Sequence, residues 1–250
     1  LFELVEPHDL LKFGIIPEEL EKFFTRAASY SSISLDGIQF HTSWNMNSTQ
    51  QILAIKALSR RLKTWSESEL KRIKFIDIGG GYWPEKGEWL RSPEAETGKY
   101  ENRTWNRSVP ITQFASELAA AVKQELFPLV HCQIRFEPGR WIADSAMHVL
   151  VSVADRKSDT TVITDGATNC IGWDRFQSDY CPVINLTHPS QTEHACRLYG
   201  SLCDPHDIWG FSYFGSEIQK GDVLLIPEQG AYTYSLQQHF IKPLPPVAEQ

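Results

Sequence analysis

The 250-residue sequence predicts an α/β region followed by an all-β region. Up to about residue 145, short apolar segments alternate with stretches of helical periodicity. After that residue the helical patterns vanish, and short β-branched runs between glycine turns take over. In the first region, two apolar runs end directly in glycine-bearing segments, at 75–81 and 134–140. Each is typical of a buried parallel strand that runs into exposed backbone N–H groups.

The first region contains three predicted helices and three predicted strands. The helices are 17–28, 49–65 and 112–126. The strands are 33–41, 75–78 and 134–137. A proline at the first helical turn and acidic residues after it support the start of the first helix. Strands separated by helices predict right-handed βαβ units and a parallel sheet, but three or four units are too few to close an eight-stranded barrel.

The segment 82–110 lacks clear periodicity, and we interpret it as a long loop that flanks the active site. Beyond it, the second region predicts a β-sandwich or an open barrel. Its expected strands are 147–155, 161–163, 222–226 and 232–236. The change from helical to strand patterns near residues 143–145 divides the chain into predicted domains 1–145 and 146–250.

Composition excludes several classes of protein. A net charge of −7 without a basic stripe argues against a nucleic-acid partner, and no apolar run reaches membrane-spanning length. Five cysteines, an odd number without CxxC spacing, predict a reduced cytoplasmic enzyme, and no metal site is expected. Because Leu1 is not methionine, either the chain was processed or it is a carboxy-terminal portion of a longer protein, and we favour the portion.

The two glycine-bearing segments predict an anion site. Glycines let an anion approach the main chain, and an arginine can grip it with a forked donor. The predicted phosphate-binding residues are Gly79, Gly80, Gly81, Gly139 and Arg140. Glu137 beside them suggests that the phosphorylated ligand also carries a basic ring nitrogen. The alternatives are that the glycines only form tight turns and that Glu137 is a surface carboxylate.

Five motifs in order resemble a known family. They are His41 and the segments 77–81 (Asp-Ile-Gly-Gly-Gly), 137–140 (Glu-Pro-Gly-Arg), 200–204 (Gly-Ser-Leu-Cys-Asp) and 230–232 (Gly-Ala-Tyr). The chain resembles the fold-type III pyridoxal-phosphate decarboxylases, a group that includes ornithine, diaminopimelate and carboxynorspermidine decarboxylases. The resemblance implies the later half of a (β/α)₈ barrel of the alanine-racemase type over 1–145, then an antiparallel β-sandwich or barrel. It also implies pyridoxal 5′-phosphate as cofactor, an amino-acid substrate, and a homodimer with shared active sites.

The resemblance gives cofactor-binding roles to three side chains besides Arg140. Glu137 would hold the proton on the pyridine nitrogen, His41 would stack on the ring, and Tyr232 would add a hydroxyl donor to the phosphate. Alternatively, His41 is a satisfied polar residue and Tyr232 a half-buried strand tyrosine. The family usually continues His-x-Gly-Ser, whereas this chain reads Thr-Ser-Trp-Asn over 42–45, so a serine contact to the phosphate stays open.

The resemblance also implies which residues contact the substrate. Cys203, contributed by a partner subunit, would protonate the α-carbon after carbon dioxide leaves, and Asp204 would contact the distal end of the substrate. Aspartate at this point resembles the ornithine-type enzymes, which favours a basic amino acid such as ornithine or lysine. Asp165 would add a contact, with Asp174 and Arg175 as weaker candidates. The alternative for Cys203 is a small buried hydrophobe.

The nucleophile of the family has no counterpart in this sequence. Family members hold the cofactor on a lysine in the first barrel strand, and Lys12, Lys56 and Lys74 lack that context. Either the lysine lies in preceding sequence or the chain is a cofactor-less relative. Two other functions therefore stay open: an amino-acid racemase on the same fold, and an inactive decarboxylase homologue with a regulatory binding role.

Overall fold

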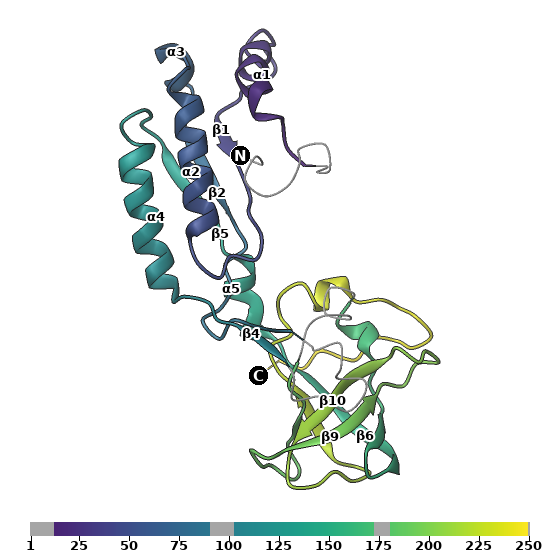
Figure 1. Ribbon diagram of the computed structural model, residues 1–250. Coiled ribbons are helices and arrows are strands. Elements are labelled where there is room, and N and C mark those ends of the chain that lie inside the picture. Colours follow the sequence, from purple (N-terminus) through teal and green to yellow (C-terminus); the bar gives the residue numbers. More distant parts are fainter. Residues whose placement is uncertain (1–12, 91–102, 173–180, 250) are drawn as a thin grey trace. The chain divides into compact units, whose positions relative to one another are not determined.

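The computed structural model describes residues 13–90, 103–172 and 181–249 (Figure 1). The chain forms two compact units. Unit 1 consists of Leu1–Lys86 and Ser108–Gly139, and unit 2 of Gly87–Arg107 and Arg140–Gln250. The chain therefore passes between the units at three places. The domain division at residue 145 stays a prediction.

Unit 1 contains a three-stranded parallel sheet with β2 in the centre, as the alternating pattern predicts. The strands are β1 (Gly37–Gln39), β2 (Phe75–Gly80) and β5 (Gln133–Glu137), in the order β1-β2-β5. Strand β1 is shorter than expected, because Ile33 is exposed and its N–H bonds to Tyr30 in a turn. Strand β2 is longer than expected, because Gly79 and Gly80 continue it.

All three predicted helices of unit 1 are present, together with one short helix that the pattern did not reveal. The helices are α1 (Leu20–Ala27) after the 3₁₀ turn η3 (Pro17–Glu19), α2 (Thr49–Leu62), α3 (Glu67–Leu70) and α4 (Ile111–Glu125). Helix α3 begins with a capping box: Ser66 Oγ accepts from the Glu69 N–H, and the Glu69 carboxylate accepts from the Ser66 N–H. This local signal was available in the sequence.

The core of unit 1 joins the apolar stripes of α2 and α4 to the sheet, and the two helices lie side by side (Figure 1). Its fully buried side chains include Ile55, Leu58, Leu62, Ile76, Ile78, Phe114 and Leu118. Burying each such side chain contributes roughly 1.5–3 kcal/mol. This packing fixes the strands and therefore the positions of the residues that follow their carboxyl ends.

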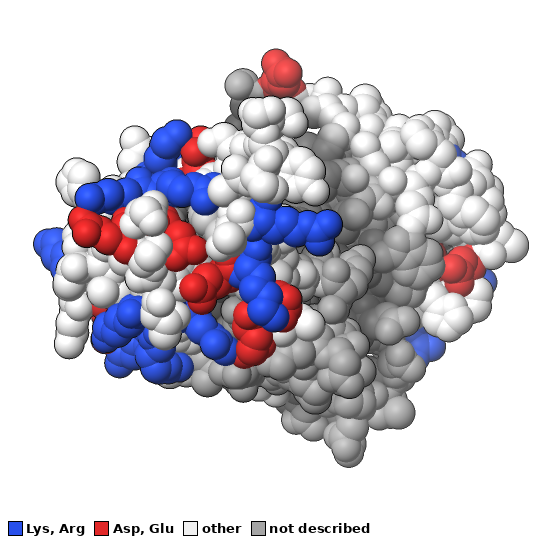
Figure 2. All heavy atoms as spheres, turned by 90° about the horizontal axis from the view of Figure 1, so that it is seen from above, with Lys and Arg blue, Asp and Glu red and all other residues white. Residues whose placement is uncertain are grey.

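Charged side chains of both signs are interspersed on the surface seen in Figure 2. Several are paired at the outer faces of the helices, as Lys71 with Glu67 (2.6 Å) and Lys22 with Glu19 (2.7 Å). Exposed pairs of this kind contribute at most about 1 kcal/mol each. Among the described residues, none of the helices combines the length and apolar character that crossing a bilayer requires.

Unit 2 contains a six-stranded sheet that closes into a barrel. Its strands are β6 (Val149–Ser158), β7 (Thr161–Thr164), β8 (Ile184–Asn185), β9 (Glu193–Tyr199), β10 (Ile208–Phe214) and β11 (Val223–Ile226). The pairs β7–β9 and β8–β10 are parallel and the other pairs antiparallel, so the sheet is mixed rather than purely antiparallel. The ring closes between β8 and β10 through one residue pair, Ile184 with Phe214.

Two expectations for unit 2 and its neighbourhood are wrong. Residues 232–236 form a turn and the 3₁₀ helix η7 (Tyr234–Leu236) instead of a strand, because Tyr232 adopts a φ of 58°, which a strand excludes. The segment 82–110 is not entirely loop, since β3 (Glu88–Leu90) and β4 (Thr104–Asn106) pair antiparallel. Residues 91–102 lie outside the described part of the chain.

The excursion 87–107 is attached to the barrel by a charged contact. Arg103 donates from both terminal nitrogens to the Glu193 carboxylate, at 2.8 and 3.1 Å, and Ser212 Oγ donates to the same carboxylate at 2.6 Å. Arg103 and Glu193 are both largely buried. A two-point arginine–carboxylate contact fixes geometry as well as adding energy, so this contact explains why the excursion belongs to unit 2.

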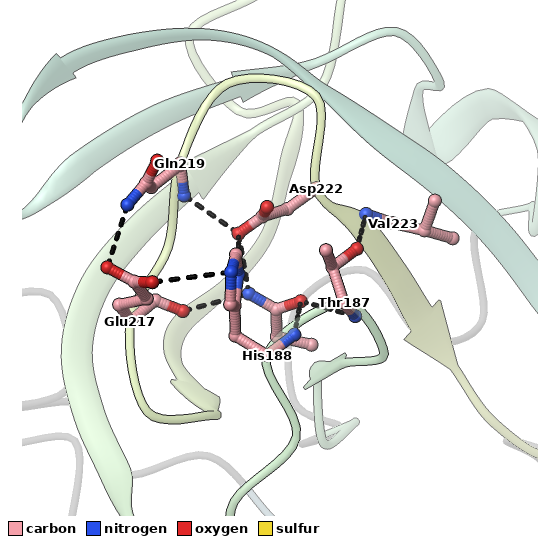
Figure 3. A network of polar contacts seen from close by, with 7 residues as sticks. Thr187, His188, Glu217, Gln219, Asp222 and Val223 are labelled. Carbon is pink, nitrogen blue, oxygen red and sulfur yellow. Dashed lines mark hydrogen bonds and ion pairs between the residues drawn. The ribbon is translucent and has the colours of Figure 1, made fainter.

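A buried carboxylate organises the barrel next to β11 (Figure 3). Asp222 Oδ2 accepts from Asn185 Nδ2 and from the Gln219 N–H, both at 2.8 Å, and lies 3.2 Å from His188 Nδ1. The other ring nitrogen of His188 lies 3.3 Å from Glu217 Oε1. Burial alone would raise the pKa of Asp222, but the hydrogen bonds from Gln219, Asn185 and His188 together lower it.

Candidate functional site

His41 and Glu137 face each other at the carboxyl end of the unit 1 sheet. His41 follows β1, and Glu137 is the last residue of β5, so the parallel sheet brings them to the same edge. Nδ1 of His41 lies 3.3 Å from Oε2 of Glu137. The two side chains are 41% and 46% exposed, which leaves both accessible to a ligand. An imidazole and a carboxylate are thus within reach of one flat molecule.

The two glycine-bearing segments lie next to each other, as the anion-site prediction requires. Gly80 is the ladder partner of Glu137. A Cβ on Gly80 would lie 2.2 Å from the Glu137 carbonyl oxygen, so any side chain there would force β2 and β5 apart. Gly139, exposed, follows two residues later and begins the short helix α5 (Gly139–Ala143).

The amides of this turn are less open than the sequence suggested. The Gly79 N–H donates to Asp77 Oδ1 at 2.9 Å, and the Gly80 N–H donates to His41 Nδ1 at 3.3 Å. Both residues are buried, so the expectation of exposed N–H groups is wrong for Gly79 and Gly80. Gly81 is half-buried and has a φ of 78°. An anion here would use the Gly81 end of the turn or displace a side chain.

Nδ1 of His41 lies within hydrogen-bond distance of two neighbours, and its protonation decides which hydrogen bond forms. Nδ1 lies 3.3 Å from the Gly80 nitrogen and 3.3 Å from Glu137 Oε2. Without a proton, Nδ1 accepts from Gly80; with a proton, it donates to Glu137. The tautomer of His41 therefore decides whether the Glu137 carboxylate has a donor.

In unit 2, Arg140 and Tyr232 lie together although 92 positions (232 − 140) separate them in the sequence. The guanidinium carbon of Arg140 is 5.0 Å from the centre of the Tyr232 ring, a cation–π distance. The Gly230 N–H donates to the Asp144 carbonyl at 3.1 Å, which holds the turn of Tyr232 against the segment after α5. Two residues predicted for the same phosphate are thus neighbours within one unit.

Cys203 and Asp204 lie in the 200–207 loop, which connects β9 to β10. Cys203 is exposed, so its alternative interpretation as a small buried hydrophobe is wrong. Oδ1 of Asp204 accepts from the His206 N–H at 2.9 Å and lies 3.1 Å from the His206 ring. The His206 N–H is the largest cause that lowers the pKa of Asp204, which keeps this carboxylate charged.

Asp165 contributes to the same loop mainly through its backbone. Its Oδ1 accepts from the Ser152 N–H at 2.7 Å, and its carbonyl accepts from Ser201 Oγ at 2.9 Å and from Lys242 Nζ at 3.1 Å. Lys242 also donates to Ser201 Oγ at 2.7 Å, a contact that no sequence pattern indicated. The weaker candidates Asp174 and Arg175 lie outside the described residues.

In the part of the chain that the structure describes, no group of three or more His, Cys, Asp or Glu side chains is arranged to hold a metal ion.

Comparison with protein families gives two matches that together cover most of the chain. Residues 6–144, more than half of the chain, match the model described as pyridoxal-dependent decarboxylase, pyridoxal binding domain. Residues 84–230 match pyridoxal-dependent decarboxylase, C-terminal sheet domain. The two matches overlap over residues 84–144, a stretch that includes the excursion 87–107 of unit 2.

Individual relatives are similar at low identity. The chain is 25% identical over 243 residues to the chloroplastic ornithine decarboxylase of Nicotiana glutinosa, covering 92% of this chain and 51% of the relative. It is 26% identical over 246 residues to the 2-[(L-alanin-3-ylcarbamoyl)methyl]-2-hydroxybutanedioate decarboxylase of Staphylococcus aureus, covering 91% and 56%. The chain thus spans about half the length of these relatives.

Solved structures support the fold. Diaminopimelate decarboxylase from Helicobacter pylori, complexed with L-lysine, has a TM-score of 0.70 at 20% identity, covering 91% of this chain and 52% of that one. Lysine/ornithine decarboxylase from Vibrio vulnificus, complexed with cadaverine, has a TM-score of 0.70 at 21% identity, covering 92% and 57%. The fold of both units is therefore that of known decarboxylases.

Proposed function

The chain belongs to the pyridoxal-dependent decarboxylase family, and from this we propose that the whole protein decarboxylates a basic or diamino acid, ornithine- or lysine-like, with pyridoxal 5′-phosphate. The observation that carries the proposal is the His41–Glu137 pair at 3.3 Å, beside the glycine turn. The names of relatives that act on ornithine, lysine and diaminopimelate support the substrate class.

The residues of unit 1 fit a flat pyridine. Glu137 holds a proton on the ring nitrogen, because an opposite charge favours the protonated form. The imidazole of His41 stacks on the ring and excludes water from that face. When bound, the cofactor supplies an electron sink for the charge left by departing carbon dioxide.

Each unit has its own proposed phosphate donors. In unit 2, Arg140 carries a forked donor and a permanent charge, and Tyr232 carries a hydroxyl. In unit 1, the proposed donors are the backbone N–H groups of Gly79, Gly80, Gly81 and Gly139. The Gly79 and Gly80 amides reach an anion only when Asp77 and His41 release them. We place the first anion contact at Gly81 for this reason.

The 200–207 loop forms the substrate side. Asp204, charged, binds the distal ammonium of the substrate. Cys203, exposed, delivers a proton to the α-carbon after carbon dioxide leaves, because a thiol pKa is readily tuned to the working range. Asp165 borders the loop through Ser201. The loop serves the partner subunit of a homodimer with shared active sites, and we place the protein in the cytoplasm, in polyamine or lysine metabolism.

The test uses the whole protein, reconstituted with pyridoxal phosphate, and measures labelled carbon dioxide released from carboxyl-labelled D- and L-ornithine and D- and L-lysine. Glu137→Gln preserves shape but removes the charge, so we expect cofactor binding to persist while kcat falls at least about 100-fold. The matched control is Glu67→Gln at an exposed helical glutamate, which leaves kcat unchanged.

The same experiment separates the alternatives. Interconversion of D- and L-substrate without carbon dioxide release would replace the proposal with a racemase. A folded whole protein that retains no pyridoxal phosphate after reconstitution would identify an inactive homologue with a regulatory binding role.

A further inference from the structure

The buried carboxylate of Asp207 accepts hydrogen bonds from within and beside the 200–207 loop. Asp207, immediately before β10, is 1% exposed. Its backbone also takes part, since the Gly200 N–H donates to the Asp207 carbonyl at 2.8 Å and the Asp207 N–H donates to the Asp204 carbonyl at 3.1 Å. The two ends of the loop are therefore joined, and the Asp207 side chain points into the space that they enclose.

Both oxygens of the Asp207 carboxylate have donors. Oδ2 accepts from the Leu202 N–H at 2.7 Å. Oδ1 accepts from the Thr168 N–H at 2.9 Å and from Thr168 Oγ1 at 2.8 Å. These three donors surround a carboxylate that has no cation partner among the described residues. Short hydrogen bonds to an ionised acceptor are about twice as strong as neutral ones, so Asp207 ties Leu202 firmly to the 3₁₀ turn η6 (Thr168–Cys170).

Gly200 provides an independent observation. A Cβ at position 200 would lie 2.2 Å from both Oδ1 and Oδ2 of Asp207. The carboxylate occupies the volume that any other side chain would need, so Gly200 and Asp207 are matched to each other.

The Leu202 amide immediately precedes Cys203. Fixing this amide fixes the backbone from which the exposed thiol and Asp204 project. We propose that Asp207 is the positioning residue of the 200–207 loop: it contacts neither substrate nor cofactor, and it sets the placement of Cys203 and Asp204. This assignment rests on the proposed function for the roles of those two side chains, but the hold of Asp207 on the loop is measurable without any activity.

The primary variant is Asp207→Asn in the whole protein. An amide has one acceptor oxygen, so either the Leu202 N–H or the Thr168 donors face an NH₂ group. We expect amide hydrogen exchange in 200–206 to accelerate at least about tenfold, the scale of losing one buried acceptor. In the same variant, kcat for the decarboxylated substrate falls about tenfold or more, while pyridoxal phosphate retention is unchanged. Asp159→Asn, at a 92% exposed side chain, is the matched control.

A second pair of variants separates positioning from general damage. Gly200→Ala alone should accelerate loop exchange, because its methyl group meets the carboxylate. In an Asp207→Ala background, Gly200→Ala should add little, because the group that it meets is gone.

Unchanged loop exchange in Asp207→Asn would overturn the proposal, as would additive effects of the two alanine substitutions. Accelerated exchange with unchanged kcat and KM would also overturn it, because Asp207 would then be structural only. If the wild-type protein releases no carbon dioxide from any substrate, the proposed function fails, and the exchange experiment alone decides whether Asp207 holds the loop.

Discussion

Units 1 and 2 bury different kinds of polar group. Among the described residues, the buried polar side chains of unit 1 are all neutral: Asn45, Ser48, Gln51, Ser59 and Ser108. Unit 2 buries three aspartates: Asp144, Asp207 and Asp222. Unit 1 depends on apolar stripes packed on regular elements, whereas unit 2 uses the carboxylates of Asp207 and Asp222 to hold turns. A buried carboxylate stabilises only while it is charged and fully hydrogen-bonded, so the two units should respond differently to truncation and to acid.

The largest expected effect is a cavity in unit 1. Leu58→Ala removes a side chain that is 1% exposed, and we expect the free energy of unfolding to fall by about 3–4 kcal/mol. Hydrogen exchange should accelerate in α2, β2 and α4 more than in β9 and β10. The control, Leu150→Ala at a 60% exposed position, should change the free energy of unfolding little. Equal acceleration in both units would contradict the comparison.

In unit 2, replacing a buried carboxylate should lower the free energy of unfolding almost as much as truncating an apolar core side chain does in unit 1. Asp222→Ala removes the acceptor of the Gln219 N–H and one of the two acceptors of the buried Asn185 Nδ2, so we expect a loss of about 2–3 kcal/mol in a denaturation experiment. Asp159→Ala, on the surface, should cost almost nothing. A loss of similar size in both variants would mean that burial of the carboxylate is irrelevant.

Acid should weaken unit 2 through Asp222. The pKa of Asp222 is lowered in the folded state, so its stabilisation is fully present above the ordinary aspartate pKa of about 3.9 and is lost as pH falls through the lower folded value. Hydrogen exchange followed from pH 5 downward should lose protection in β6 and β11 before β2, at about pH 4 and below. The Asp222→Asn variant should show a flatter acid dependence; an unchanged slope would refute the assignment.

The smallest expected effect concerns a surface carboxylate. His206 lies 3.1 Å from Asp204 Oδ1 and competes with a substrate ammonium for the same oxygen. We expect His206→Asn to lower KM for ornithine or lysine about twofold, because exposed ion pairs are weak, and to leave kcat unchanged. A higher KM would show that the ring helps to bind the substrate.

Much of unit 1 was predictable because its site residues follow regular elements. Glu137 ends one strand of a parallel sheet and His41 follows another, and strands of this kind place their carboxyl ends at one edge. The occupied amides of Gly79 and Gly80 were not predictable, because His41, the acceptor of the Gly80 amide, lies 39 positions away (80 − 41) and its ring orientation depends on packing. Sequence motifs report which residues are present, not which groups already have a partner.

Unit 2 was harder to predict. Its short strands identified a β region, but closure of the barrel depends on pairings such as β8 with β11, which no local pattern contains. The strand expected at 232–236 was wrong because the left-handed conformation of Tyr232 arises from its surroundings. The role of Asp207 was not predicted, because an aspartate close to Cys203 and Asp204 in the sequence is typical of an exposed loop. Its burial depends on the folded loop, in which Gly200 leaves space for the carboxylate and the Leu202 N–H donates to it.

The three passages of the chain between the units have a consequence for how the protein is made. Strand β5 reaches its partner β2 only after the excursion 87–107 has been synthesised, and Arg103 must then wait for Glu193 to leave the ribosome. Neither unit corresponds to one uninterrupted stretch of the coding sequence. A chain that ends anywhere between residues 87 and 107 therefore leaves both units incomplete.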